Sequence, residues 1–83
     1  MKVLYFAWLR DRVGTAEETI ETPAEVATVA DLMGWLAGRS DGHAKAFATP
    51  DQVRCAIDQA FAGPDASVSD AAEVAFFPPV TGG

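Results

Sequence analysis

The first segment of the chain, residues 2–9, is rich in β-branched and aromatic residues and predicts a strand. Side chains alternate along a strand, so one face would carry Val3, Tyr5, Ala7 and Leu9, and the other Leu4, Phe6 and Trp8. Both faces are apolar, which indicates a central strand or a strand that keeps one face for a partner. Residues 10–16 are polar and include Gly14, which predicts a turn. Residues 17–21 predict a short exposed strand, so residues 2–21 are expected to form a hairpin.

The clearest helix of the chain is predicted to begin after Thr28. The Thr28 hydroxyl can accept a hydrogen bond from a free amide of the first turn, and Asp31 three residues later completes a capping box. Apolar residues then recur at helical spacing: Val29, Leu32, Met33 and Leu36. Gly38 is expected to end the helix in a left-handed conformation. Gly34 costs about 1 kcal/mol relative to alanine, and close packing against the sheet would be a reason to tolerate it.

Further strands are predicted in the second half of the chain. Residues 43–48 are expected to add one helical turn. Residues 53–58 alternate between apolar and polar or small residues, which indicates a half-buried strand. Asp58 and Gln59 are assigned to a turn, and a short strand is expected around Phe61.

Residues 73–77 predict the last strand, because Pro78 and Pro79 cannot continue a ladder of hydrogen bonds. The long helix therefore follows a hairpin and precedes two or three strands. When the last strand returns through the middle of the sheet, this order gives an α+β fold of the β-grasp type. We expect a mixed sheet of four to five strands packed on one main helix over residues 1–77, followed by an extended C-terminal tail over residues 78–83.

Composition and charge limit the functions of the chain. With 83 residues, 49% of them apolar, it can build one core but not a deep active-site pocket as well. Twelve acidic residues against six basic ones give a formal net charge of −6. This charge argues against a nucleic-acid partner, because such proteins carry a basic surface. It suits docking on a basic protein, or it simply keeps the surface soluble.

Single copies of cysteine and histidine exclude several kinds of site. Cys55 and His43 stand alone, so this chain cannot by itself supply a zinc or iron–sulfur ligand set or a histidine-based triad. No bound metal or cofactor is expected. Cys55 is interpreted as a small core residue, and His43 as an exposed residue of a polar loop. No apolar run approaches the roughly 18 residues of a spanning helix, so a cytoplasmic protein without a membrane partner is expected.

The last residues combine two prolines with two glycines. Pro78 and Pro79 fix the backbone angle φ near −65° and favour an extended stalk. Gly82 and Gly83 lack a Cβ, so the tip can pass close to the wall of a narrow channel. This shape suits a terminal carboxylate that reacts inside another protein. The carboxylate must first be activated, for instance as a mixed anhydride with a nucleotide phosphate, before sulfur replaces the phosphate and leaves a thiocarboxylate.

A docking surface for the partner is expected beside this tail. Phe76 and Phe77 alternate, so we expect one of them to pack on the helix and the other to enter an apolar patch, unless both lie in the core. The residues predicted to contact a partner are Phe6, Phe76, Phe77, Pro78, Pro79, Val80 and Thr81. Arg10 and Arg12 are interpreted as solvated charges rather than partner contacts.

Two segments carry a resemblance to a known family: KVLYFA at residues 2–7 and EVAFFPPVTGG at residues 73–83. Both are similar to those of the ubiquitin-like sulfur carriers of the ThiS/MoaD family, which include the small subunit of molybdopterin synthase. The likeness covers essentially the whole chain, and the ending is its specific part. The family usually has Gly-Asp-Glu where this chain has Ala71-Ala72-Glu73. Because alanine tolerates positive φ poorly, the tight turn before the last strand is expected to change.

The resemblance implies a role in sulfur transfer. An adenylating enzyme would use ATP to activate Gly83, and a sulfur donor would convert the activated group to a thiocarboxylate. The large synthase subunit would then receive the tail, including Gly82, and insert the sulfur into precursor Z to build molybdopterin. In an assembly of two small and two large subunits the catalytic lysines belong to the large subunit. This chain is therefore expected to be a sulfur donor without catalytic side chains of its own.

Three other functions stay open on the sequence alone. A sulfur carrier for thiazole synthesis uses the same terminal chemistry, but it is usually shorter and lacks the Phe-Pro-Pro-Val run. A ubiquitin-like protein modifier would be joined to lysines of its targets. A plain interaction domain would keep its function after deletion of Gly82 and Gly83.

Overall fold

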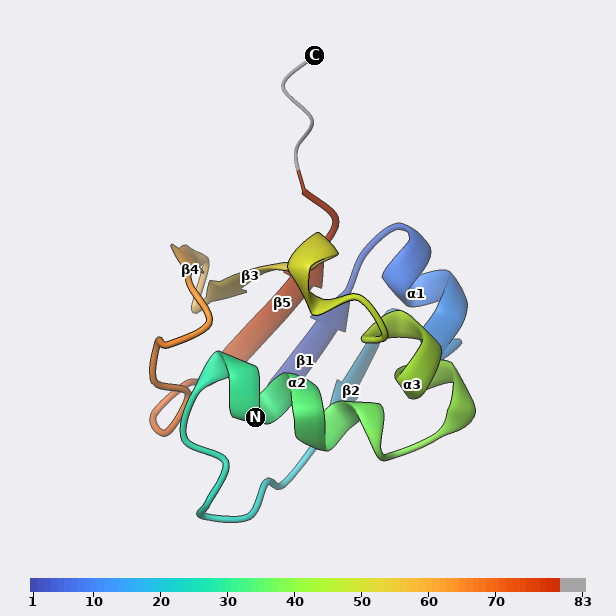
Figure 1. Cartoon of the computed structure of the whole chain (residues 1–83). Coiled ribbons are helices and arrows are strands. Elements are labelled where there is room, and N and C mark those ends of the chain that lie inside the picture. Colours follow the sequence, from blue (N-terminus) through green and yellow to red (C-terminus); the bar gives the residue numbers. More distant parts are fainter. Residues whose placement is uncertain (80–83) are drawn as a thin grey trace.

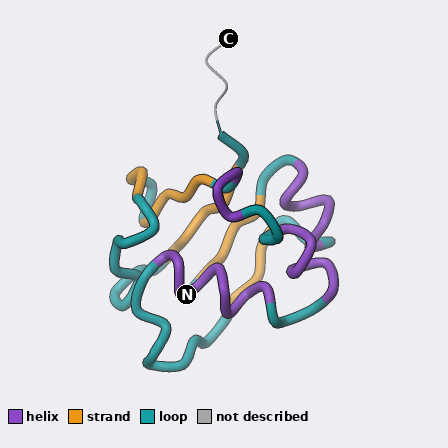
Figure 2. Tube along the Cα trace, in the orientation of Figure 1, coloured by secondary structure: helices purple, strands orange, loops and turns teal. Residues whose placement is uncertain are grey.

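The computed structural model describes residues 1–79, which form a five-stranded sheet with α2, α3 and η1 on one of its faces (Figures 1 and 2). The strands are β1 (Lys2–Tyr5), β2 (Glu17–Thr19), β3 (Arg54–Ile57), β4 (Ala60–Ala62) and β5 (Glu73–Phe77). The helices are α1 (Trp8–Val13), α2 (Val29–Ala37), α3 (Asp41–Ala46) and the short 3-10 helix η1 (Pro50–Gln52). In this part of the chain no helix has the length and apolar character needed to cross a membrane.

The last strand lies in the centre of the sheet. The strands follow the order β2-β1-β5-β3-β4, with β5 parallel to β1 and antiparallel to β3. The outer pairs, β1 with β2 and β3 with β4, are antiparallel. This arrangement confirms the predicted α+β fold of β-grasp type, including the return of the last strand through the middle of a mixed sheet.

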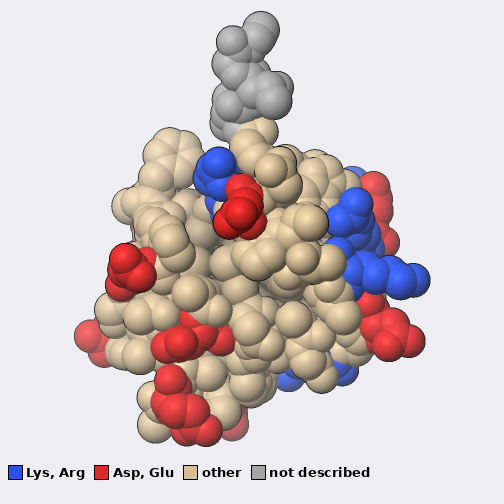
Figure 3. Space-filling model, viewed as in Figure 1, with Lys and Arg blue, Asp and Glu red and all other residues tan. Residues whose placement is uncertain are grey.

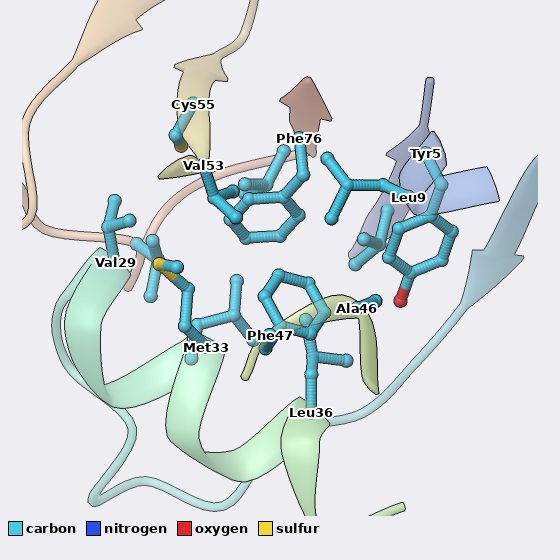
Figure 4. Close-up of a cluster of buried hydrophobic side chains, with 14 of the residues drawn as sticks. Tyr5, Leu9, Val29, Met33, Leu36, Ala46, Phe47, Val53, Cys55 and Phe76 are labelled. Atoms are coloured by element: carbon cyan, nitrogen blue, oxygen red, sulfur yellow. The ribbon is translucent and has the colours of Figure 1, made fainter. Parts of the chain in front are cut away.

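The register of the central strands decides which side chains form the core. Val3 pairs with Val74 and Tyr5 with Phe76, so these four share one face of the sheet, and all four are buried. Figure 4 shows Phe76 and Tyr5 turned toward α2. The ring of Phe47, just after α3, packs edge-on against Phe76 with the centroids 5.1 Å apart. The buried face of α2 is the predicted one: Val29, Leu32, Met33 and Leu36.

The start of α2 confirms the predicted capping box. The Thr28 hydroxyl accepts a hydrogen bond from the Asp31 amide at 3.2 Å, and the Asp31 carboxylate accepts one from the Thr28 amide at 3.2 Å. The same carboxylate accepts a hydrogen bond from the Ala27 amide. These amide hydrogen bonds, that of Ala27 first, hold the pKa of Asp31 below its ordinary value. The helix therefore begins where its local sequence specifies.

The predicted strand over residues 2–9 is wrong after β1, and so is the simple hairpin. Ala7 adopts a positive φ of 54°, the chain turns, and the following residues form α1. The Phe6 amide still donates to the Phe76 carbonyl oxygen at 3.1 Å, but β5 ends one residue later. The prolines that follow β5 have no amide hydrogen, so β1 would gain little by running on. The second predicted strand does pair with β1, as β2.

Two expectations about the glycines of α2 are also wrong. Gly38 has a φ of −84°, so α2 does not end in a left-handed residue. Gly34 is not tightly packed, because a Cβ there would meet nothing within 4 Å. It lines a cavity of about 750 Å³ between α2 and β3. Gly14, in contrast, has a φ of 96° and turns the chain after α1, as predicted.

The turn between β3 and β4 explains how the chain tolerates alanines before β5. Asp58 and Gln59, with φ of 48° and 72°, form the two-residue turn between β3 and β4, which confirms their assignment. The Asp58 carboxylate also accepts hydrogen bonds from the Ala72 and Glu73 amides at 3.1 and 2.9 Å. Neither Ala71 nor Ala72 has a positive φ, so the alanines do not strain this turn.

Two glycine substitutions are expected to have opposite effects on stability. In Gly42→Ala the new Cβ would overlap the Arg12 carbonyl oxygen where α3 meets α1, so the free energy of unfolding falls by about 1–3 kcal/mol. In Gly34→Ala the Cβ enters open space, and the free energy of unfolding rises by about 1 kcal/mol because alanine is the better helix former. Denaturant unfolding measures both values. Stabilisation by Gly42→Ala would contradict the packing of α3 on α1.

Candidate functional site

The face of the sheet turned away from α2 carries an apolar surface. Side chains alternate along β5, so Ala75 and Phe77 point away from α2. The register places Leu4 and Ala56 on either side of Ala75, and Phe61 opposite Ala56. Figure 1 shows α2, α3 and η1 on the other face. We call this surface the open face, and its members are Leu4, Phe6, Ala56, Phe61, Ala75 and Phe77.

Two phenylalanines of the open face are exposed. Phe6 is 49% and Phe61 is 85% exposed, and within residues 1–79 they are the large apolar side chains that solvent reaches most. Phe6 follows directly after β1, and the register of β1 with β5 places it next to Phe77. Phe77 is half-buried, and its ring centroid lies 5.8 Å from that of Phe61. Exposed aromatic clusters of this kind are typical of protein–protein interfaces. The sequence indicated a strand at Phe61 but not its exposure.

The structure separates the two phenylalanines that were predicted to dock. Phe76 is fully buried, and its ring centroid lies 6.4 Å from that of Tyr5 on the core side of β5. Its assignment to a partner-binding surface is therefore wrong. Phe77 points to the open face, so one of the pair packs under the helices and the other does not. That Phe6 and Phe77 contact a partner stays a prediction.

The end of β5 forms the base of the expected stalk. Phe77 is the last residue of β5, and Pro78 and Pro79 after it are half-buried. Phe6, which follows β1, lies beside this base next to Phe77. The assignments to the rest of the stalk and to the reactive tip lie outside the described residues, at Val80, Thr81, Gly82 and Gly83.

Most positive charge gathers over α1 and α3, and Arg54 lies beside the end of β5. Figure 3 shows Lys and Arg side chains over α1 and α3. The Arg12 guanidinium lies 4.4 Å from the centroid of the Trp8 ring and donates a hydrogen bond to the Lys45 carbonyl oxygen at 3.2 Å. Arg10 and Arg12 are both exposed, as expected for solvated charges.

The described residues offer neither a reactive thiol nor a metal-binding cluster. Cys55 is buried, which confirms its interpretation as a core residue. Burial raises the pKa of the Cys55 thiol to about 11, so the thiol stays protonated at neutral pH and is a poor nucleophile. No group of three or more His, Cys, Asp or Glu within residues 1–79 is placed to hold a metal ion.

Comparison with known proteins identifies the family. The profile of the ThiS family matches residues 3–83. The chain belongs to the ThiS family. This ThiS-family chain is 41% identical over 83 residues to the molybdopterin synthase sulfur carrier subunit of Escherichia coli (strain K12), which covers the whole chain and 99% of that protein. It is 34% identical, with the same coverage, to the protein of that name from Haemophilus influenzae (strain ATCC 51907 / DSM 11121 / KW20 / Rd).

Two solved structures share the fold of the ThiS-family chain. The putative molybdopterin converting factor, subunit 1, from Pyrococcus furiosus has a TM-score of 0.75 and 35% identity over 95% of each chain. SAMP1 from Haloferax volcanii has a TM-score of 0.73 and 25% identity over 100% of this chain and 98% of SAMP1. These likenesses agree with the β-grasp fold that the strand order gives.

The ThiS-family chain also contains a polar cluster that the sequence did not indicate. The Tyr5 hydroxyl donates to Glu18 Oε2 at 2.7 Å, and His43 Nε2 lies 2.7 Å from the same oxygen. Ser40 Oγ lies 2.7 Å from His43 Nδ1, and the Arg39 guanidinium lies 3.4 Å from the other Glu18 oxygen. The cluster therefore ties β1 and β2 to the corner between α2 and α3.

The interpretation of His43 as an exposed loop residue is wrong. His43 is only 8% exposed, because it lies in α3, which begins at Asp41. Its ring packs edge-on against the Tyr5 ring, with the two centroids 6.0 Å apart. The Ser40 hydroxyl accepts a hydrogen bond from the His43 amide at 3.1 Å and caps α3. A serine three residues before His43 was the available signal, since this is the spacing of an N-cap.

The surroundings of Glu18 shift its pKa in opposing directions. Burial on its own raises the pKa of Glu18, but the hydrogen bonds from His43 and Tyr5, together with nearby positive charge, outweigh it and hold the pKa below its ordinary value. Burial, and next the hydrogen bond to Glu18, raises the pKa of Tyr5. Glu18 is thus an ionised acceptor and Tyr5 a neutral donor at neutral pH.

The lowered pKa of Glu18 predicts that the fold loses stability in acid. Glu18 stays ionised to a lower pH in the folded protein, so its contribution is present above the unfolded pKa of about 4.3 and is lost as the pH falls through the folded pKa. Glu18→Gln is expected to reduce the free energy of unfolding at neutral pH by about 1 kcal/mol and to weaken its decline in acid. Denaturant unfolding from neutral pH to about pH 3 measures this.

The exposed Glu25 provides the control. Glu25→Gln removes the same charge without touching the cluster, so it should leave the acid dependence close to that of the unmodified chain. If Glu18→Gln declines in acid as steeply as Glu25→Gln, the cluster does not hold Glu18 as described.

Proposed function

We propose that this ThiS-family protein is a sulfur carrier of molybdopterin biosynthesis, in which Gly83 carries the sulfur as a thiocarboxylate. The extent of the match supports this proposal most. The ThiS family reaches residue 83, and both relatives named molybdopterin synthase sulfur carrier subunit align over all 83 residues. The final Gly82 and Gly83 therefore fall within the matched region.

The chemistry of a carboxylate explains why the carrier needs an activating enzyme. A terminal carboxylate has an ordinary pKa of about 3.3–3.7, and the resulting anion resists attack at its carbonyl carbon. In the proposed first step a carboxylate oxygen of Gly83 attacks the α-phosphorus of ATP, and pyrophosphate leaves. In the second step a sulfide sulfur attacks the acyl carbon of the adenylate and AMP leaves, so that the thiocarboxylate remains.

In this proposal the carrier supplies a substrate group and its partners supply the catalysis. ATP is consumed by the adenylating enzyme, and no cofactor is held by this chain. The catalytic side chains belong to the adenylating enzyme and to the large synthase subunit, in a cytoplasmic assembly of two small and two large subunits. Gly82 and Gly83 suit such partners, because backbone without a Cβ can approach their reacting groups closely.

The open face supplies the docking surface for both partners. Phe6 and Phe61 are exposed aromatic side chains, the type that anchors protein interfaces. Phe6 and Phe77 lie beside the base of the stalk. A partner that covers the open face is therefore in position to receive the residues that follow Pro79.

Sulfur loading is expected to appear as a gain in the mass of the intact chain. After incubation with ATP, the adenylating enzyme and a sulfide donor, a chain that ends at Gly83 should gain about 16 Da, the difference between sulfur and oxygen. Mass spectrometry measures the gain. The control carries one alanine after Gly83 and should stay unloaded, because its last residue brings a Cβ into the active site.

Two results would contradict the proposal. The first is the absence of any gain, and the second is equal loading of the control. Mixing the loaded chain with the large synthase subunit and precursor Z should then yield molybdopterin, whereas loading without this product would favour the carrier of thiazole synthesis.

Loss of the exposed ring of Phe61 is expected to weaken docking without affecting the fold. Because Phe61 is 85% exposed, Phe61→Ser should change the free energy of unfolding by no more than about 0.5 kcal/mol. Affinity for the large synthase subunit should fall at least about tenfold, as for an anchor residue. Calorimetric titration measures the affinity. Ala44→Ser, on the exposed side of α3, is the control, and equal affinities of the two variants would exclude Phe61 from the interface.

A further inference from the structure

Ala7 adopts a backbone conformation that alanine rarely takes. Its φ of 54° and ψ of −131° match the first central position of a type II′ turn, about +60° and −120°, where glycine is the usual residue. The Leu9 amide closes the turn by donating to the Phe6 carbonyl oxygen at 3.2 Å. For an L-residue this conformation is strained, so the surrounding structure must impose it.

Contacts on both sides of Ala7 impose the turn. Before it, the Phe6 amide donates to the Phe76 carbonyl oxygen at 3.1 Å, one step beyond β1 in the pairing with β5. After it, Leu9 is fully buried in the core, and the close approach at Gly42 holds α1 against α3. Ala7 therefore has to reverse the chain between two fixed points.

The turn at Ala7 ends β1 beside the end of β5, where the stalk begins. A longer β1 would continue past Phe77 and run beside Pro78 and Pro79, as the register shows. The turn directs the chain into α1 instead and leaves Phe6 49% exposed. It also ends β1 before the strand could pair with Pro78 and Pro79.

We propose that Ala7 is a positioning residue for partner docking. Its strained turn keeps Phe6 exposed at the base of the stalk and stops β1 from running beside Pro78 and Pro79. This strain lowers the stability of the fold at the proposed docking surface. Strained residues are often found at functional sites. The docking part of this inference rests on the proposed function, whereas the part that concerns the turn does not.

Two substitutions at residue 7 are expected to change the stability of the turn in opposite directions. Valine is β-branched, disfavours a positive φ and favours a strand, so Ala7→Val should lower the Tm by about 5 °C or more and expose the Leu9 amide to hydrogen exchange. Ala7→D-Ala, made by chemical ligation at Cys55, keeps the composition and reverses the preferred sign of φ. It should raise the Tm by a similar amount and keep the Leu9 amide protected.

The KM of the adenylating enzyme for the carrier distinguishes a positioning role of Ala7 from an effect on stability alone. At a temperature where all variants are folded, Ala7→Val should raise the KM about tenfold, and Ala7→D-Ala should leave it within about twofold. Val68→Ala is the matched control, because it removes buried side-chain atoms before the start of β5, at the end away from the stalk. It should lower the Tm and leave the KM unchanged.

Hydroxyl-radical labelling of Phe6 reports its exposure without any partner. The extent of Phe6 labelling in Ala7→Val should differ from that in the unmodified chain. In Ala7→D-Ala it should match that of the unmodified chain. The inference is overturned when Leu9 exchange and Phe6 labelling in Ala7→Val match those of the unmodified chain, or when the KM follows the Tm in all three variants. A chain that is never loaded would instead refute the proposed function, and the exchange and labelling results would still decide whether Ala7 sets the turn and the exposure of Phe6.

Discussion

The parallel pairing of β1 with β5 is the constraint on which the rest of the structure depends. Its register puts Tyr5 and Phe76 under the helices and turns Phe77 to the open face. Because Pro78 and Pro79 cannot donate to a ladder, β5 ends at Phe77. The strand that fills the core therefore also leads into Pro78 and Pro79, so in the proposed function it supports both the docking surface and the tail.

The helical side of the molecule makes this support rigid. The cluster of Tyr5, Glu18 and His43 connects two strands to α3 through hydrogen bonds of 2.7 Å, and the close contact at Gly42 connects α3 to α1. These contacts involve α1, α3 and the β1–β2 side of the sheet, and α3 lies on the face opposite the open face. In the proposed function the carrier is a fixed platform, and the chemistry takes place within its partners.

Features with local causes were predictable from the sequence. The start of α2 follows from Thr28 and Asp31, which bond to each other, and the end of β5 follows from two prolines. His43 was misjudged because its partner Glu18 lies 25 residues away, which no local pattern reveals. The prediction of a strand through Ala7 is wrong because the strand propensity of residues 2–9 does not reveal a turn that tertiary contacts impose. Alternation showed that Phe76 and Phe77 face opposite ways, but the helices decide which face is covered.

Fragment mass spectrometry of the sulfur-loaded chain tests the central claim most directly, because it locates the sulfur. The account predicts a gain of about 16 Da in fragments that contain Gly83 and no gain in fragments that contain Cys55, whose buried thiol is unreactive. A gain of about 32 Da on the Cys55 fragment, the mark of a persulfide, together with an unmodified Gly83, would contradict it.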